Sequence, residues 1–376
     1  MPRGADATRL LLAPVGIDAL LDRRLILCVG CGGVGKTTIA SALAVAAAGR
    51  GRRTVVLTVD PARRLKSALG LETLDHEIHS VPLGGGHSLD AMMLDTKRMF
   101  DALVERFAGS PEAAARILAN RLYREISNEL AGSAEYMAME KLHELATEHS
   151  YETIVLDTPP SAHVRDLLAA PNRLLTLLAS RAVRILQAPA SLLNDAPSRT
   201  ARLALATLLK ALERWSGLPL LRDLAEFVSS FEHMLDGFAR RAREIEALVR
   251  APETAFVLVT TPAEETARTA RAFCEELRAL GCAPSGIIAN QIFAVPPIEP
   301  PRAARDRLAT KLWANYQRLR QRGLEQARAI AALCEATDLP LFACAPALAR
   351  PPVSIRDLKR MAHLLEHGLP SDNRSW

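Results

Sequence analysis

A lysine and two threonines follow four glycines at a spacing that could bind a phosphate chain. The segment from Gly30 to Thr37 fits the pattern G-x-x-x-x-G-K-[ST]. Glycines let backbone N–H groups turn toward phosphate oxygens, and the N-terminus of the following helix adds a positive dipole end. Lys36 would neutralise the β- and γ-phosphates, and the Thr37 hydroxyl would bind Mg²⁺. The motif therefore predicts a nucleotide site. The residues predicted to contact the nucleotide here are Gly30, Cys31, Gly32, Gly33, Val34, Gly35, Lys36, Thr37 and Thr38.

Two aspartates follow apolar segments and are candidates for chemistry at the phosphate chain. Asp60 comes after residues 54–59, and Asp157 ends residues 154–157. Reacting groups of α/β folds lie at the C-terminal ends of parallel strands, so both carboxylates are expected near the glycine-rich loop. Apolar residues ending in Asp match the Walker B pattern, whose carboxylate holds Mg²⁺ directly or through water. Asp60 is equally compatible with a helix N-cap, because Pro61 follows it.

The elements that must position these residues alternate along the chain. β-branched or apolar segments predict buried strands, and helical patterns separate most of them, which indicates a doubly wound, mainly parallel α/β sheet. Residues 71–86 are expected to be a loop with a glycine tip. The predicted strands are 25–29, 54–59, 89–94, 154–157, 255–260, 286–290 and 339–343.

Two long helical stretches interrupt this alternation, at about 97–149 and 164–250. We expect them to form a helical subdomain inserted in a single nucleotide-binding domain that spans 1–376. Apolar side chains share one helix face in the second stretch, which is usual for a core. If that face were exposed, it would bind another apolar helix. The residues predicted to line such a client surface are Phe227, Phe231, Leu235 and Phe238.

The composition of the chain limits which binding partners and which cellular compartment we expect. The net charge of +5 is scattered and aromatic residues are 4% of the chain, so a nucleic-acid stacking surface is not expected. The six cysteines match no secreted disulfide framework, which favours a cytoplasmic protein. No apolar run approaches the roughly 20 residues that span a bilayer, so any membrane association would be peripheral. The basic amphipathic helix at 354–366 is expected to pack on the domain.

Four motifs in a fixed order make the chain resemble the ArsA/tail-anchored-protein-targeting (guided entry) ATPase family. The resemblance spans about residues 24–347 and is to the bacterial single-module branch of this deviant-Walker P-loop class. It implies a SIMIBI-type fold. The motifs are the phosphate loop, Asp60-Pro61-Ala62, Asp157-Thr158-Pro159-Pro160 with His163, and Asn290-Gln291.

The resemblance implies a dimer that closes around two ATP molecules with Mg²⁺. Lys36 and Asp60 would then be catalytic, with Asp60 polarising the attacking water. Thr37 and Asp157 would hold the Mg²⁺ shell, and Asn290 would read adenine. Closing and reopening would be coupled to the handling or targeting of hydrophobic client helices. Two alternatives remain, an energising subunit of a membrane anion pump and a nucleotide-gated switch that hydrolyses ATP poorly.

Three features depart from the family pattern. Cys31 stands where the family has its signature lysine, which reaches across the dimer. Arg63, Arg64 or a paralogous partner in a heterodimer could supply the charge of that lysine. A homodimer and a heterodimer therefore both stay open. No cysteine lies between 291 and 333, so no structural zinc is expected there. One phosphate loop, with no cysteine near the Mg²⁺ carboxylate, argues against arsenite as a pumped anion.

Cys28 and Cys31 form a C-x-x-C motif. This motif is either a redox switch that clamps the phosphate loop, or simply a buried strand residue and its neighbour.

Overall fold

The protein forms two compact units. The first comprises residues 1–94, 144–165 and 249–376, and the second comprises 95–143 and 166–248. The first unit contains the sheet and the nucleotide motifs. The computed structural model describes residues 14–59, 64–108, 110–119, 134–158, 237, 240–293 and 307–368.

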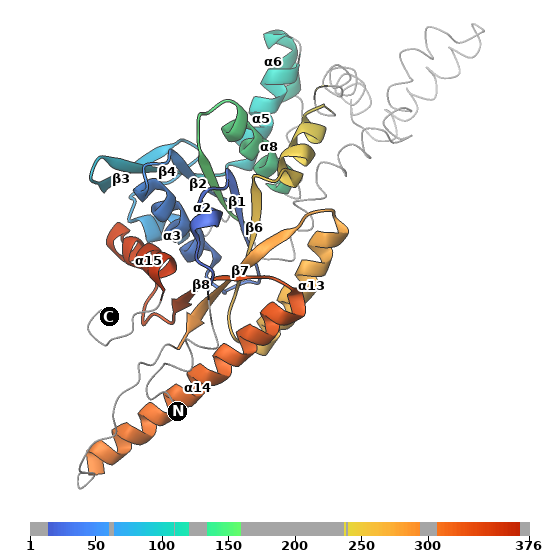
Figure 1. Cartoon of the computed structure of the whole chain (residues 1–376). Helices are drawn as coiled ribbons and strands as arrows, with labels where there is room; N and C mark the ends of the chain where they lie inside the picture. The colour runs from blue at the N-terminus through green and yellow to red at the C-terminus, as the bar shows by residue number, and fades with distance from the viewer. Residues whose placement is uncertain are drawn as a thin grey trace, which may run out of the picture. The chain divides into compact units, whose positions relative to one another are not determined.

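One mainly parallel sheet runs through the described part of the first unit (Figure 1). Its eight strands lie in the order β3-β4-β2-β5-β1-β6-β7-β8, and only β3 and β4 pair antiparallel. This arrangement confirms the doubly wound α/β fold. The strands are β1 (Leu25–Val29), β2 (Thr54–Thr58), β3 (His79–Gly84), β4 (His87–Met93), β5 (Thr153–Asp157), β6 (Thr254–Thr260), β7 (Pro284–Ile292) and β8 (Leu341–Pro346).

Helices cover both faces of the sheet, which is why its central strands are buried throughout. Successive strand residues point to opposite faces. Ile26 of β1 and Val155 of β5 belong to a core that also contains Leu43 and Leu358 from the helices on one face. α13 and α14 contact β6 and β7 on the other. The helices of the first face are α2 (Asp18–Leu21), α3 (Lys36–Gly49), α4 (Arg64–Leu69) and α15 (Ile355–His367), and those of the other are α13 (Glu264–Ala279) and α14 (Arg307–Thr337).

The described part of the second unit is helical. Its helices are α5 (Thr96–Phe107), α6 (Pro111–Ala119) and most of α8 (Ala134–Thr147). Arg241 Nε donates to the buried carboxylate of Glu140 at 2.6 Å, so α8 is bonded to the segment 240–248 of the same unit. Residues 159–236 lie outside the described part, so the predicted inserted subdomain at about 97–149 and 164–250 stays a prediction.

The segment at 71–86 corrects one expectation, because it contains a strand rather than only a loop. β3 pairs with β4 as an antiparallel hairpin at the edge of the sheet. Val81 and Leu83 are buried while their neighbours are not. Pro82 lies between them, which an edge strand tolerates because one side of it donates no ladder hydrogen bonds.

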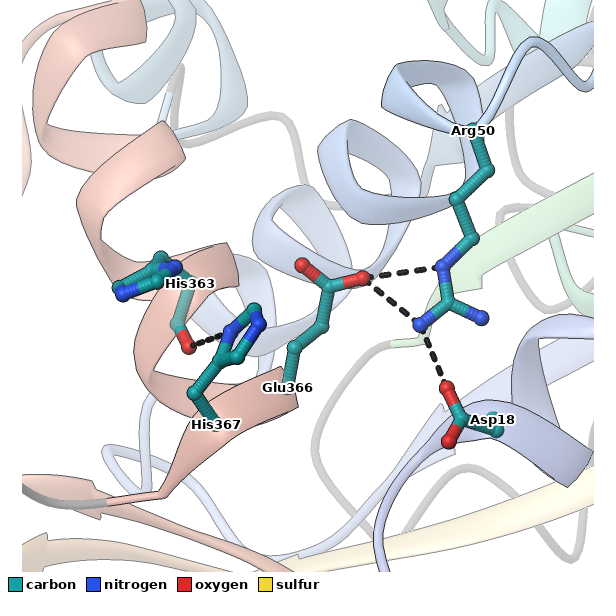
Figure 2. Close-up of polar contacts among 5 residues, drawn as sticks. All are labelled: Asp18, Arg50, His363, Glu366 and His367. Carbon is teal, nitrogen blue, oxygen red and sulfur yellow. Dashed lines mark hydrogen bonds and ion pairs between the residues drawn. The ribbon is translucent and has the colours of Figure 1, made fainter.

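Arg50 joins three helices at the end of α3 that is remote from the phosphate loop. Figure 2 shows its guanidinium between Asp18 of α2 and Glu366 of α15. Nη2 lies 2.5 Å from Asp18 Oδ1, and Nε donates to Glu366 Oε1 at 2.9 Å. α15 also buries Leu358 and Met361 against the first face. The closing helix therefore packs on the domain, as predicted.

We expect Arg50→Ala to lower the free energy of unfolding by about 1 kcal/mol, because one partly exposed cation pairs with two carboxylates. Urea unfolding measures this. Arg268→Ala is the matched control, since within the described ranges Arg268 pairs only with Glu264, at 3.5 Å and with both side chains mostly exposed. This substitution should change stability by about 0.3 kcal/mol or less. Equal effects of the two substitutions would refute the role given to Arg50.

Candidate nucleotide-binding site

The glycine-rich loop joins β1 to α3 at the C-terminal edge of the sheet. Gly30 follows β1 directly, and Gly35 is the N-cap of α3 with a left-handed backbone. Among the described residues, no side chain caps this helix. The first N–H groups of a helix have no acceptor within the helix, so the N-terminus of α3 places backbone donors beside the loop, as a phosphate-binding turn requires.

Two glycines of the loop have neighbours that leave no room for a side chain. A Cβ on Gly30 would lie 2.2 Å from the carbonyl oxygen of Val259 in β6. A Cβ on Gly35 would lie 2.1 Å from Nδ2 of Asn290 in β7, and the φ of Gly35 is +90°. Such a φ is accessible to glycine at little cost and is strained for most other residues. The loop is thus pressed against β6 and β7.

Lys36 lies inside the curve of the loop. Its side chain is almost fully buried, and Nζ donates to the carbonyl oxygens of Gly30 at 3.0 Å and Cys31 at 2.8 Å. The ammonium group is therefore held at the loop that the sequence predicts to bind phosphates, and its contact with a nucleotide stays a prediction. The sequence predicts that Lys36 neutralises phosphate charge, and the structure places its Nζ at the carbonyl oxygens of Gly30 and Cys31.

Asp157 stands behind the loop, between two threonine hydroxyls. β5 lies between β1 and β2, so the end of β5 is flanked by the ends of both strands. Thr37 Oγ1 donates to Asp157 Oδ2 at 2.8 Å, and Thr58 Oγ1 donates to the same oxygen at 3.0 Å. Asp157 is 1% exposed. A buried carboxylate with adjacent hydroxyls is a hard-oxygen donor set, which suits Mg²⁺.

Thr58 was missed by sequence reasoning. A threonine at the end of a β-branched strand carries no distinctive signal by itself. The parallel pairing of β2 with β5 sets Thr58 directly beside Asp157, and that register decides its contact.

Asn290 and Gln291 of β7 tether the loop from the other side. Asn290 Nδ2 donates to the Val34 carbonyl oxygen at 2.8 Å, and Asn290 Oδ1 accepts from the Gln291 backbone N–H at 2.9 Å. Gln291 Nε2 donates to the Gly33 carbonyl oxygen at 3.3 Å. The predicted adenine contact of Asn290 stays a prediction, and its observed contact is with the phosphate loop.

The two cysteines of the C-x-x-C differ in environment, and neither is in a disulfide. Cys28 is fully buried in β1, where burial and then the nearby charge of Asp157 raise the pKa of its thiol well above the usual range. A thiol with a raised pKa is a poor nucleophile at neutral pH. Cys31 packs against the hydrophobic core of the first unit. This geometry favours the buried-strand interpretation of Cys28.

Several predicted site residues lie outside the described residues. They include Asp60, which would polarise water, and Arg63, one of the two candidate replacements for the signature lysine; the other, Arg64, is exposed at the start of α4. The proposed client residues Phe227, Phe231, Leu235 and Phe238 also lie outside.

The phosphate loop after β1 and the buried carboxylate at the end of β5 define a P-loop nucleotide-binding protein. A family model described as "Anion-transporting ATPase" matches residues 23–317. The chain therefore belongs to this family, the ArsA ATPases, as the sequence motifs indicated.

Individual relatives are similar over part of their length. An ATPase from Halobacterium salinarum, provisionally named as arsenical pump-driving, is 32% identical over 176 residues, which are 45% of this chain and 26% of that protein. ATPase ASNA1 homolog 1 of Paramecium tetraurelia is 34% identical over 146 residues, 38% of this chain and 42% of that protein. ATPase GET3 of Malassezia globosa is 27% identical over 162 residues, 42% of this chain and 46% of that protein. The chain thus spans less than half the length of these relatives.

Proposed function

We propose that the protein is a Mg²⁺-dependent ATPase in which ATP binding and hydrolysis drive a dimer between closed and open forms. The observation that carries the proposal is the position of the Lys36 ammonium within the phosphate loop, with the Thr37–Asp157 pair directly behind it. Membership of the family described as "Anion-transporting ATPase" supports the same reading.

Each described residue has a distinct task in this proposal. Lys36 exchanges its two loop carbonyls for oxygens of the β- and γ-phosphates, which neutralises charge on the transferred group. Thr37 and Asp157 hold Mg²⁺, directly or through water. Mg²⁺ held by these two residues would supply positive charge that offsets the charge developing on the phosphate oxygens. Asp60 orients the attacking water in this scheme, on the sequence motif alone.

Thr58 is given a positioning task. Because its hydroxyl donates to the same Asp157 oxygen as Thr37, it restrains the carboxylate and shares the negative charge. Asn290 and Gln291 restrain the loop carbonyls at Val34 and Gly33. The phosphate-binding conformation is thereby fixed from both sides before a nucleotide arrives, which lowers the ordering cost of binding.

The dimer, homomeric or formed with a paralogue, would couple its closing to the exposure of an apolar helical surface that handles or targets hydrophobic client helices or a membrane protein. The names ASNA1 and GET3 belong to relatives that are similar to part of this chain. The client surface at Phe227, Phe231, Leu235 and Phe238 rests on the sequence pattern.

Two other functions compete with this one. The family description and the name of the haloarchaeal relative favour the energising subunit of an anion pump. Cys31 favours a switch that binds ATP and hydrolyses it poorly, because a side chain packed on the core carries no positive charge toward a partner's phosphates.

A turnover assay separates hydrolysis from a passive switch. Phosphate release is measured with ATP and Mg²⁺ over a range of protein concentrations, for wild type, Cys31→Lys and Lys36→Ala. We expect Mg²⁺-dependent release by wild type, no release above background by Lys36→Ala, and acceleration of about tenfold or more by Cys31→Lys, since a missing transition-state cation costs several orders of magnitude in related phosphoryl transfers.

Release only by Cys31→Lys would make the natural protein a nucleotide-gated switch. If neither wild type nor Cys31→Lys exceeds the Lys36→Ala background, the ATPase proposal is wrong.

A further inference from the structure

The two halves of α14 have different surroundings. The C-terminal half is anchored, with Gly323, Ala327, Ile330, Leu333 and Thr337 buried. Gly323 marks where anchoring begins, because a Cβ there would lie 2.5 Å from the carbonyl oxygen of Phe293. From Arg307 to Arg322 the helix has no buried residue. This half runs beyond the sheet (Figure 1), over about 24 Å at the rise of an α-helix.

An apolar stripe continues from the anchored half into the projecting half. Leu308, Leu312, Tyr316, Leu319 and Gly323 follow one another at spacings of three or four residues, so they share one helix face. Three of them are strongly exposed: Leu308 is 62% exposed, Leu312 59% and Leu319 44%. Within the described residues, these are three of the seven large apolar side chains that are exposed. They extend over about 17 Å of the helix.

Positive charge lies along the edge of this stripe. Between Arg307 and Arg322 the sequence contains five basic residues and no acidic one. Four of the five are exposed and stand one residue before a member of the stripe, which places them in a row beside it. The four are Arg307, Lys311, Arg318 and Arg322.

An aromatic pair completes the face. Trp313 and Tyr316 stack with their ring centroids 5.0 Å apart. Tryptophan and tyrosine favour the boundary between lipid headgroups and acyl chains, where an apolar ring and a polar atom are both accommodated. Arginine and lysine side chains beside an apolar face can extend their charged ends to lipid phosphates while their methylene stems stay in apolar surroundings.

Charge decides between occupants of this surface. A second copy of the same helix would bring its own row of cations beside the first, and like charges at such a contact are repelled. An anionic partner would be attracted instead. A bilayer that contains acidic lipid matches the apolar stripe, the cationic row and the aromatic pair together, whereas an acidic protein helix would match only the charge and part of the stripe.

We propose that the projecting half of α14, residues 307–322, docks on the surface of an anionic bilayer with Leu308, Leu312 and Leu319 inserted. No helix in the described ranges is long and apolar enough to cross a membrane, and this mode of docking needs none. The proposal does not rest on ATP hydrolysis, so it can fail while the ATPase proposal stands, and the reverse.

Vesicle co-sedimentation tests it with the full-length protein and no nucleotide. Vesicles of phosphatidylcholine are compared with vesicles that also contain phosphatidylserine, at low and at physiological salt. We expect at least about tenfold tighter binding to the anionic vesicles, weakened by salt. The triple variant Leu308→Gln/Leu312→Gln/Leu319→Gln should lose at least about tenfold in affinity.

A charge variant and a matched control locate the surface. Lys311→Gln/Arg318→Gln should weaken binding and reduce its salt dependence. Arg268→Gln/Arg271→Gln removes the same charge from exposed positions of α13 and should leave binding unchanged. The fluorescence of Trp313 is obtained as the difference between the emission of wild type and that of Trp313→Phe. It should shift to the blue on anionic vesicles only. Thermal unfolding checks that each variant is folded.

Four results would overturn the proposal. The first is no binding of wild type to anionic vesicles, or equal binding to neutral ones. The second is vesicle binding that the leucine variant retains. The third is that wild type does not bind vesicles but forms a dimer in analytical ultracentrifugation, and that the leucine variant is monomeric. That result would assign the face to a second copy. Binding to an acidic polypeptide without binding to vesicles would equally reject the lipid surface.

Discussion

Replacing Gly35 by alanine is expected to lower the affinity for ATP by at least about 100-fold, the loss that corresponds to roughly 2.7 kcal/mol. The new Cβ would lie 2.1 Å from Asn290 Nδ2, and the φ of +90° is one that alanine adopts only with strain. The loop must therefore move away from β7, which misplaces the N-terminus of α3. Isothermal titration calorimetry with ATP and Mg²⁺ measures the change.

Gly49→Ala is the matched control for this substitution. Gly49 lies at the other end of the same helix, and a Cβ there meets no atom within 4 Å. ATP affinity should be unchanged, and stability should rise by about 0.5–1 kcal/mol, as for glycine to alanine within a helix. Urea unfolding of both variants separates a binding defect from loss of the fold. Normal ATP affinity in a folded Gly35→Ala variant would contradict the geometry assigned to the loop.

The substitution Asp157→Asn is expected to reduce Mg²⁺-dependent turnover by at least about 100-fold. The amide oxygen can still accept hydrogen bonds from Thr37 and Thr58, so the local fold is retained while the charge that attracts Mg²⁺ is lost. Turnover is measured against Mg²⁺ concentration, and the residual rate should need much more Mg²⁺. A fluorescent ATP analogue measures nucleotide affinity in the absence of Mg²⁺, and this affinity should change little in the variant.

Asp90→Asn provides the comparison at a carboxylate of the same sheet. Asp90 in β4 accepts a hydrogen bond from the Tyr151 hydroxyl at 2.8 Å and does not contact the phosphate loop. Its variant should keep the Mg²⁺ dependence and turnover of wild type. If Asp157→Asn behaves like Asp90→Asn, the metal is held elsewhere and Asp157 has a structural role.

Most of the sheet was predictable because its strands are buried on both faces. Continuous apolar runs such as 25–29 and 154–156 carry that signal, and their strands lie in the centre of the observed order. β3 was not predictable on the same basis. It is a short edge strand that buries only Val81 and Leu83 and contains Pro82, so its sequence resembles a loop.

The candidate site was predictable where one stretch of chain supplies it. The loop from Gly30 to Thr37 and the carboxylate of Asp157 follow from local patterns. The hydrogen bond from Asn290 to Val34 joins residues 256 positions apart, and the sheet order brings them together. A sequence can predict that Asn290 lies near the C-terminal end of a strand, but whether its amide contacts a base or a loop carbonyl depends on β6 lying between β1 and β7.

The orientation of Cys31 was likewise beyond the sequence. Its position in the motif indicated a lost cation, and the fold determines that this side chain packs on the core. In the ATPase proposal, the positive charge that Cys31 lacks is therefore supplied by another residue or by a partner chain.

A crystal structure of the protein with Mg²⁺ and a non-hydrolysable ATP analogue is the decisive test of the proposed nucleotide site. We predict that the β- and γ-phosphates lie inside the loop at 30–37 and that Mg²⁺ lies beside Thr37 Oγ1 and Asp157. Lys36 Nζ should have moved from the carbonyl oxygens of Gly30 and Cys31 to phosphate oxygens. An analogue bound elsewhere, with Lys36 still on those two carbonyls, would contradict it.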